Sequence, residues 1–335
     1  MSYLFPAKSI TFDAALRDLA SGSPKARIAA AHARGDVSDA AERRRAVDAL
    51  IGALDDDRVE VRAEACSSLA GLGDLGEPKV IAALAKRLTD GTAAVRQNAA
   101  IALGTLGHPD GFAPLAEALA EGPADLRFQA VSSLAEIDAP RAYDPAVAAL
   151  GDLDPQVIGA AALALGGIGD GRAVTQLIGK LAIADLGARF DVAYALAELD
   201  SAAGRGVLVD ALADADRAWD AVTALGWLGA ADDVAALARA MTGKKTPPEV
   251  AVLAAGQVLA LGPTSAHAEG ARKILLDALG VRKVHVRGVA VEQLGAAGGP
   301  WAIAPLDKLA RSGKGDELRD AIAIAIRAIE ARAAT

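Results

Sequence analysis

Residues 95–107, VRQNAAIALGTLG, decide the fold because related stretches return along the chain. Clear copies read VRAEACSSLAGLG from Val61, LRFQAVSSLAEID from Leu126, VIGAAALALGGIG from Val157 and ARFDVAYALAELD from Ala188. Weaker copies begin at Ala26, Arg217, Val250, Val286 and Leu318. The copies start 29 to 36 residues apart, a period that is typical of a stack of similar units rather than of one globular core. Such a stack works mainly through a long surface.

Each unit predicts a pair of helices, which we call the A helix and the B helix. In the third unit, residues 78–88 (PKVIAALAKRL) repeat apolar side chains at three- and four-residue steps, as an amphipathic helix does. Thr89 and Asp90 then supply turn and N-cap chemistry, and residues 95–106 form the B helix. Gly107 follows where a left-handed C-terminal cap is expected. The same place is held by Gly73, Gly169, Gly229, Gly262 and Gly298.

The apolar residues of the B helix fall in one arc of the helical wheel. Counted from the first residue of each copy, they occupy positions 1, 5, 8, 9 and 12. In the third unit these positions are Val95, Ala99, Ala102, Leu103 and Leu106. The small residues at positions 5 and 8 predict helices that approach one another closely. No segment alternates usefully with a period of two, so we expect almost no strand.

The A-helix pattern GRAVTQLIGKL from Gly171, a turn that contains Asp, and the B-helix pattern VR-x-x-A-x-x-A-L-x-x-L-G resemble HEAT repeats. The resemblance is greatest to the short bacterial subtype first known from phycobilin lyases, and it covers about residues 10–331. It implies an all-α fold, a right-handed α-solenoid of about ten helical hairpins that forms a single domain over residues 1–335. The hairpins are expected at about residues 10–35, 40–73, 77–107, 111–138, 142–169, 172–200, 204–229, 232–262, 266–298 and 301–331.

The resemblance also implies a structural ladder of Asp–Arg pairs between neighbouring units. Position 2 of the B helix is often Arg, and acids occur in the turn before it. The expected members are Arg62, Asp90, Arg96, Arg127, Asp154, Asp185 and Arg189. Ile158, Ala218 and Ala251 replace the Arg and break the pattern. The alternative reading, a basic stripe for phosphates, is disfavoured because the acids would neutralise most of its field.

Composition narrows the range of partners and compartments. The net charge of −8 argues against nucleic acid and against an anionic membrane surface. No run of 18 apolar residues occurs, and the first residues do not read as a secretory signal. Cys66 is the only cysteine, so no internal disulfide is possible, and its place in a repeat helix predicts a buried residue. We therefore expect a cytoplasmic protein.

The sequence contains no residue pattern that indicates a catalytic reaction. None of the four histidines is followed by Glu, whereas the hydroxylase branch of the family binds iron through His-Glu pairs. No spacing of His or Cys indicates zinc, and the glycine-rich residues 166–171 end a helix instead of following a strand. No Ser has a neighbouring His for a nucleophilic relay. We expect no catalytic residue, no metal and no cofactor.

The B-helix face opposite the core, at positions 3, 7 and 10, is almost free of charge. It carries small or apolar residues in most units, with aromatic residues in units four to seven. Because an exposed apolar strip usually marks a partner surface, we expect a concave groove with an acidic rim. The expected groove residues are Ile101, Phe128, Leu163, Phe190, Asp191, Tyr194, Trp219 and Asp220. Trp227, at position 11, is expected in the core. Packing of the aromatic residues inside the stack remains an alternative.

The leading functional hypothesis is a non-enzymatic scaffold or adaptor whose groove holds an apolar or amphipathic protein segment with some positive charge. A second hypothesis, implied by the resemblance, is a lyase-like or chaperone-like protein that holds a tetrapyrrole in the groove. A third is a nucleic-acid enzyme like the HEAT-like glycosylases, with Asp191 and Asp220 beside Phe190 and Trp219. The acidic balance of the chain makes this third hypothesis the weakest.

Overall fold

The computed structural model describes residues 11–33, 39–72 and 78–334. Within these ranges the chain forms twenty α-helices and five short 3₁₀ helices, and no strand. The chain divides into an N-terminal unit that ends at Ala173 and a C-terminal unit that begins at Val174. The division falls within α11 (Ala173–Ile178), the A helix of the sixth repeat. The prediction of an all-α repeat fold is confirmed.

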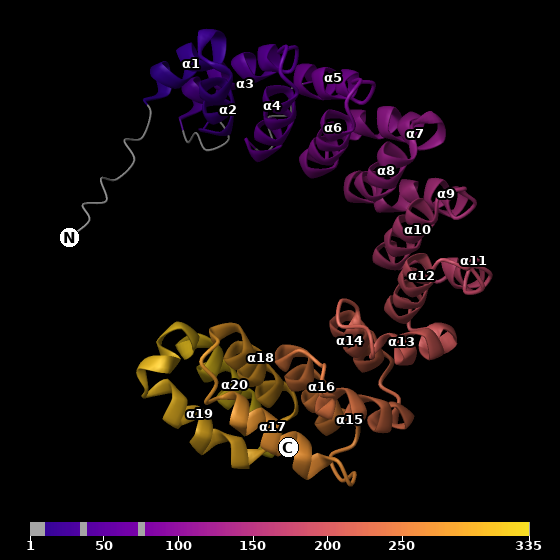
Figure 1. The fold of residues 1–335 in the computed structure, drawn as a ribbon, viewed down its shortest axis with the longest axis vertical. Helices are drawn as coiled ribbons and strands as arrows, with labels where there is room; N and C mark the ends of the chain where they lie inside the picture. Colours follow the sequence, from indigo (N-terminus) through magenta and orange to yellow (C-terminus); the bar gives the residue numbers. More distant parts are fainter. Residues whose placement is uncertain (1–10, 34–38, 73–77, 335) are drawn as a thin grey trace. The chain divides into compact units, whose positions relative to one another are not determined.

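The N-terminal unit contains five helical hairpins, each with an A helix followed by a B helix. The A helices are α1 (Phe12–Ser21), α3 (Ala40–Ala53), α5 (Pro78–Arg87), α7 (Phe112–Glu121) and α9 (Ala139–Ala149). The B helices are α2 (Pro24–Ala33), α4 (Val59–Gly71), α6 (Ala93–Leu106), α8 (Ala124–Ile137) and α10 (Pro155–Ile168). Figure 1 shows the two sets as two layers, with the B helices on the inner side of the curve of this unit.

The C-terminal unit continues the same alternation. After α11, its A helices are α13 (Arg205–Ala211), α15 (Val234–Thr242), α17 (Ala268–Ala278) and α19 (Ile303–Ala310). Its B helices are α12 (Leu186–Glu198), α14 (Ala218–Leu228), α16 (Pro248–Leu261), α18 (Val284–Ala297) and α20 (Arg319–Ala333). The 3₁₀ helices are η1 (Pro109–Gly111), η2 (Ala202–Gly204), η3 (Ala231–Asp233), η4 (Pro300–Ala302) and η5 (Gly313–Leu318). The first four of these lead directly into an A helix.

The B helices end as predicted in three repeats but not in two others. Gly107, Gly169 and Gly229 have φ values of 62°, 74° and 65°, the left-handed conformation that glycine adopts without strain. At Gly262 and Gly298 the prediction is wrong, because φ is −142° and −72°. A proline follows one or two residues later in both cases, and the residue before a proline favours an extended backbone. Gly73 lies outside the described residues.

The core of each hairpin is built from small aliphatic side chains. In α6, Val95, Ala99, Ala102 and Leu103 have no exposed surface, as their positions predict, whereas Leu106 is half-buried. Cys66 is also completely buried, and burial raises the pKa of its thiol to about 12. This cysteine is therefore part of the packing and stays protonated at neutral pH.

Aromatic residues of the A helices form contacts between repeats in the N-terminal unit. The Arg141 guanidinium of α9 lies 3.9 Å from the centre of the Phe112 ring of α7, and the Arg172 guanidinium lies 4.3 Å from that of Tyr143. Such cation–π contacts hold a positive charge against an apolar surface. They link α7 and α9 each to the repeat that follows.

Candidate functional site

The predicted ladder forms between the first repeats of the N-terminal unit. Arg62 of α4 donates from Nε to Asp90 Oδ2 at 2.9 Å and from Nη2 to Asp90 Oδ1 at 3.0 Å. Asp90 stands in the turn of the following repeat, so this bidentate pair joins two hairpins. Burial opposes ionisation of Asp90, but the hydrogen bonds from Arg62 and Thr92, together with the positive charge of Arg62, outweigh it and hold the pKa of this carboxyl below its ordinary value.

Three more pairs repeat this arrangement along the same unit. They join Arg27 to Asp56 at 2.9 Å, Arg96 to Asp125 at 2.9 Å, and Arg127 to Asp152 at 2.6 Å. Each guanidinium also donates to a backbone carbonyl of its own repeat, as Arg96 does to Asp90 O at 2.9 Å. The ladder therefore ties each hairpin both to itself and to the next, which is a structural role.

Asp154, Asp185 and Arg189, which were expected in the ladder, have other partners. Asp154 caps α10 by accepting from Gln156 N at 2.9 Å, because the residue two positions earlier, Asp152, already receives Arg127. Asp185 caps α12 by accepting from Ala188 N at 2.9 Å. Arg189 donates to Ile183 O at 2.8 Å. The pattern ends after the fourth repeat, since the fifth carries Ile158 in place of Arg.

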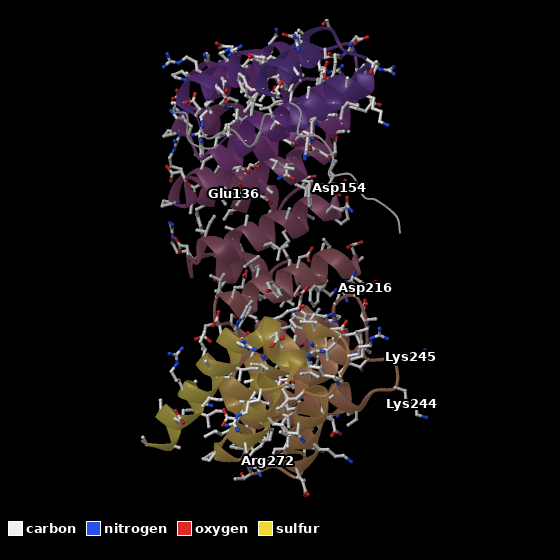
Figure 2. All side chains as sticks on the ribbon, turned by 90° about the vertical axis from the view of Figure 1, so that its left-hand side faces the viewer. Glu136, Asp154, Asp216, Lys244, Lys245 and Arg272 are labelled. Carbon is white, nitrogen blue, oxygen red and sulfur yellow. The ribbon has the colours of Figure 1, made fainter. Side chains whose placement is uncertain are left out.

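Figure 2 helps to locate the ladder relative to the rest of the N-terminal unit. Glu136 marks the C-terminal end of α8 and Asp154 marks the start of α10, and they lie toward opposite sides of the ribbon. Successive B helices therefore run in the same direction. The ladder residues lie along the edge where the B helices begin, and the exposed face between the two edges is left for other contacts.

In the N-terminal unit, the three predicted apolar groove residues are exposed on consecutive B helices. Ile101 of α6, Phe128 of α8 and Leu163 of α10 have 42%, 41% and 40% of their surface exposed. They stand at positions 3 or 7, as the sequence predicts. We call these three side chains the N-terminal apolar face.

In the C-terminal unit, the prediction for Phe190 is wrong. This ring is only 6% exposed and belongs to the same apolar core as Ala218 and Val222. The Arg217 guanidinium lies 5.9 Å from its centre. Ala218 stands where other repeats carry the ladder Arg, and it too is buried in this core.

The other predicted groove residues of this unit lie on its surface or just below it. Trp219 is 38% exposed, Asp220 is exposed, and Tyr194 and Asp191 are half-buried. Trp227 contradicts the expectation of a core residue, because 48% of its surface is exposed. Its ring meets Tyr194 edge-on, with centroids 5.2 Å apart and an interplanar angle of 67°.

The B-helix face is rotated slightly from the predicted one, which explains Trp227. Position 11 is exposed in all eight B helices from α4 to α18, whereas position 10 is buried or half-buried in each of them. A Cβ added at Gly104 would lie 3.0 Å from Ser133 Cα, and one at Gly295 would lie 3.1 Å from Ala325 Cα. Position 10 therefore packs on the next B helix and is not open to a partner backbone. Position 11 is thus exposed throughout, whereas position 3 is exposed only in α8 and α14 and position 7 only in α4, α6, α10 and α18 among these eight helices.

Three carboxylates surround the exposed aromatic rings of the C-terminal unit. We define the aromatic–acidic patch as Tyr194, Trp219 and Trp227 together with Asp191, Glu198 and Asp220. Burial raises the pKa of Asp191, and the negative charges of Asp185 and Asp220 add to this effect while Arg217 opposes it. Burial also raises the pKa of Tyr194, assisted by Glu198 and Asp220, and it raises the pKa of Glu198.

Open clefts lie elsewhere, between successive A helices. One, of about 550 Å³, is lined by Leu119, Pro145 and Leu153 and by the ladder pair Arg127 and Asp152. Among the described residues, no group of three or more His, Cys, Asp or Glu side chains is arranged to hold a metal ion. No helix in the described part of the chain is long and apolar enough to cross a membrane.

Comparison with known proteins agrees with this repeat architecture. The family model for HEAT repeats matches residues 14–95, 81–154 and 112–185, which together take in 172 of the 335 residues. A search of curated proteins found no match.

Several solved structures are similar to the chain. Importin beta has a TM-score of 0.56 at 13% identity, covering 95% of this chain and 52% of importin beta. The complex of CpcE and CpcF of phycocyanin lyase from Nostoc sp. PCC7120 has a TM-score of 0.40 at 24% identity, covering 82% of this chain and 98% of the other. An engineered protein has a TM-score of 0.42 at 20% identity, covering 95% and 98%. The likeness to importin beta shows a shared helical-repeat fold.

Proposed function

Because the chain belongs to the HEAT-repeat family, we propose that it is a non-catalytic, cytoplasmic scaffold that holds a partner protein on the exposed face of its B helices. The distribution of exposed apolar side chains carries this proposal. Nine large apolar residues of the described chain are exposed, and six of them stand at positions 3, 7 or 11 of a B helix. These six are Ile101, Phe128, Leu163, Trp219, Trp227 and Ile324.

The energetics favour a partner that contacts several repeats at once. Covering about 100 Å² of apolar surface contributes roughly 2.5 kcal/mol, and association itself costs about 4–15 kcal/mol. One exposed side chain cannot offset that cost. Three side chains on the adjacent helices α6, α8 and α10 together contribute roughly 7.5 kcal/mol, which offsets the lower part of that cost range. An apolar or amphipathic segment laid across these helices would cover all three and add contacts of its own.

The test uses two double variants of matched chemistry. Phe128→Ser with Leu163→Ser removes two residues of the N-terminal apolar face. Leu153→Ser with Leu186→Ser, called the turn variant, removes two exposed apolar residues, one in the turn before α10 and one at the first residue of α12, next to the turn. Each variant and the wild type are used as bait in lysate of the source organism, and captured proteins are quantified by mass spectrometry.

We expect the face variant to lose at least tenfold of a specific captured protein, the loss that about 1.4 kcal/mol produces. The turn variant should retain it, and both should keep the wild-type melting temperature because all four side chains are exposed. Equal capture by the face variant and the wild type would reject the proposal. Incubation with a bilin provides an independent check, since a bound, red-shifted pigment lost in the face variant would assign the face to a tetrapyrrole.

A further inference from the structure

We propose that the aromatic–acidic patch of the C-terminal unit binds a Lys or Arg side chain of a partner segment, so that the scaffold selects basic amphipathic segments. This inference rests on the proposed function and names the chemistry of the partner. It commits to a protein segment as the occupant, and the argument is one of charge complementarity at an exposed aromatic surface.

The aromatic part of the patch offers π surface to a cation. Trp227 is nearly half exposed, and the edge-on contact at 5.2 Å fixes it against Tyr194. Tyr194 is in turn held by Phe190 of the core, with ring centroids 6.2 Å apart. Trp219 stands two helical turns before Trp227 on α14 and is also exposed. Indole and phenol rings attract ammonium and guanidinium groups through their electron-rich faces.

The acidic part of the patch lacks a cation of its own. Asp191, Glu198 and Asp220 make no ion pair in the part of the chain that the structure describes. Arg217 is the nearest positive charge to act on Asp191, but its guanidinium donates to Asp214 at 3.2 Å. Of the three carboxylates, Asp191 is thus influenced by one nearby cation, and that cation is already paired with Asp214. The N-terminal ladder differs, since its acids are each matched by an Arg.

The carboxylates and the rings form one cluster and not two separate features. The negative charge of Asp220 acts on both Asp191 and Tyr194, and that of Glu198 acts on Tyr194. Asp191 and Glu198 stand three residues before and four residues after Tyr194 on α12, and Asp220 is next to Trp219 on α14, so acids on both helices lie close to the rings. A cation that contacts these rings would be close to the carboxylates as well, and partial burial strengthens such an interaction relative to a fully solvated one.

The N-terminal apolar face does not share this chemistry. Positions 3, 7 and 11 of α6 are Gln97, Ile101 and Thr105, and those of α10 are Gly159, Leu163 and Gly167. On α8 the single acid at these positions is Glu136. The contrast assigns apolar contact to the N-terminal face and cation recognition to the aromatic–acidic patch.

The test uses three short amphipathic peptides that share one leucine pattern and carry Lys, Gln or Glu at the remaining positions. Binding is followed by tryptophan fluorescence in a Trp301→Phe background, which leaves Trp219 and Trp227 as reporters. The patch variant is Asp191→Asn with Asp220→Asn. The matched control is Asp210→Asn with Asp277→Asn, which removes the same charge from exposed positions on the A helices α13 and α17.

We expect the lysine peptide to bind the starting protein at least tenfold more tightly than it binds the patch variant. The control variant should stay within about twofold of the starting protein, since distant exposed charges are screened by salt. The glutamate peptide should not bind. Circular dichroism melting curves establish that each variant is folded.

Three results would overturn the inference. The lysine peptide could bind the patch variant as tightly as the starting protein, or the control variant could lose as much affinity as the patch variant. The glutamine peptide could also match the lysine peptide, in which case the face binds apolar segments and the preference for a cation is wrong. If none of the three peptides binds, the patch is not a peptide-binding surface, and the capture experiment on the N-terminal apolar face decides the proposed function separately.

Discussion

At the scale of the residue, the same repeat position performs different tasks in different repeats. Arg62, Arg189 and Arg287 all occupy position 2 of a B helix. Arg62 pairs with Asp90, Arg189 donates to Ile183 O, and Arg287 donates to Val281 O and Lys314 O. A guanidinium has five N–H donors, and it donates them to backbone carbonyl oxygens where the next repeat provides no acid within reach. Each of these three guanidinium groups therefore anchors the turn before its helix, but among the described residues the Arg at position 2 forms an ion pair with the next repeat only in the N-terminal unit.

Asp90→Asn should destabilise the protein by about 1.5–3 kcal/mol at neutral pH, since a hydrogen-bonded charge of a mostly buried pair is lost. The folded state lowers the pKa of Asp90 from its ordinary value of 3.8. Its contribution is therefore complete above pH 3.8 and is lost as pH falls through the lower, folded-state pKa. The difference in free energy of unfolding between wild type and variant should shrink over that acidic range in urea titrations.

Asp154→Asn is the control for this prediction. Asp154 caps α10 and is outside the ladder, and Asn is as good an N-cap as Asp. We expect a change below about 0.5 kcal/mol at either pH. A destabilisation by Asp154→Asn as large as that by Asp90→Asn would contradict the separation of cap and ladder.

At the scale of the element, the sequence predicted the helices better than their exact rotation. The core positions of α6 and its left-handed cap at Gly107 follow from apolar spacing and from glycine chemistry, both of which are local. Which side of the B helix meets the next repeat depends on how two helices cross, and no single repeat contains that information. Positions 10 and 11 differ by one residue, yet Gly226 packs on Gln257 and Trp227 reaches the surface.

Gly104→Ala should destabilise the protein by about 1–3 kcal/mol, although alanine favours a helix over glycine. The added Cβ would lie 2.9 Å from Ser133 Cβ and 3.0 Å from Ser133 Cα, so the two B helices must move apart. Gly52→Ala in α3 is the matched substitution, because a Cβ there meets nothing within 4 Å. It should stabilise by about 0.5–1 kcal/mol. Chemical denaturation measures both, and a stabilising Gly104→Ala would show that α6 and α8 do not cross so closely.

The sequence predicted the kind of site, an exposed apolar face of the B helices with acidic residues beside it, but not every residue that forms it. Phe128 and Phe190 share position 3, and the sequence treats them alike, but only Phe128 is exposed. Phe190 is buried in a core that also contains Ala218 and Val222 of the following repeat, a relation between two repeats that spacing alone does not reveal. Glu198 and Trp227 both stand at position 11, which the sequence pattern did not assign to the exposed face. For Glu198 the available signal was its place four residues after Tyr194, since residues three or four apart share a helix face. The contact of Trp227 with Tyr194 joins α12 to α14 and has no such local signal.

At the scale of the whole molecule, stability in a repeat protein is a sum over hairpins and their junctions. The N-terminal unit joins its hairpins by four ladder pairs, whereas in the C-terminal unit the buried Asp233 pairs with Arg205 at 2.6 Å on the A-helix side. The two units therefore use different junctions. A substitution at one junction should therefore lower the local stability of the two adjoining hairpins and have little effect on the others.

Arg62→Ala should raise amide hydrogen exchange in α3 to α6, because it breaks the junction between the second and third hairpins. Protection in α16 and α18 should stay within the error of the wild type. Hydrogen-exchange mass spectrometry on the intact chain measures both regions in one sample. A uniform loss of protection along all twenty helices would instead indicate a single cooperative unit and would contradict the nearest-neighbour description.

The alternation between packed position 10 and open position 11 has a consequence for how such a chain can be altered. Substitutions at position 11, and at positions 3 and 7 in those repeats where the side chain is exposed, change what the surface recognises while the stacking of the hairpins stays intact. The binding specificity can therefore be changed one repeat at a time. By contrast, deletion of one residue inside a B helix would move the residue at exposed position 11 to position 10, where it would pack against the next hairpin.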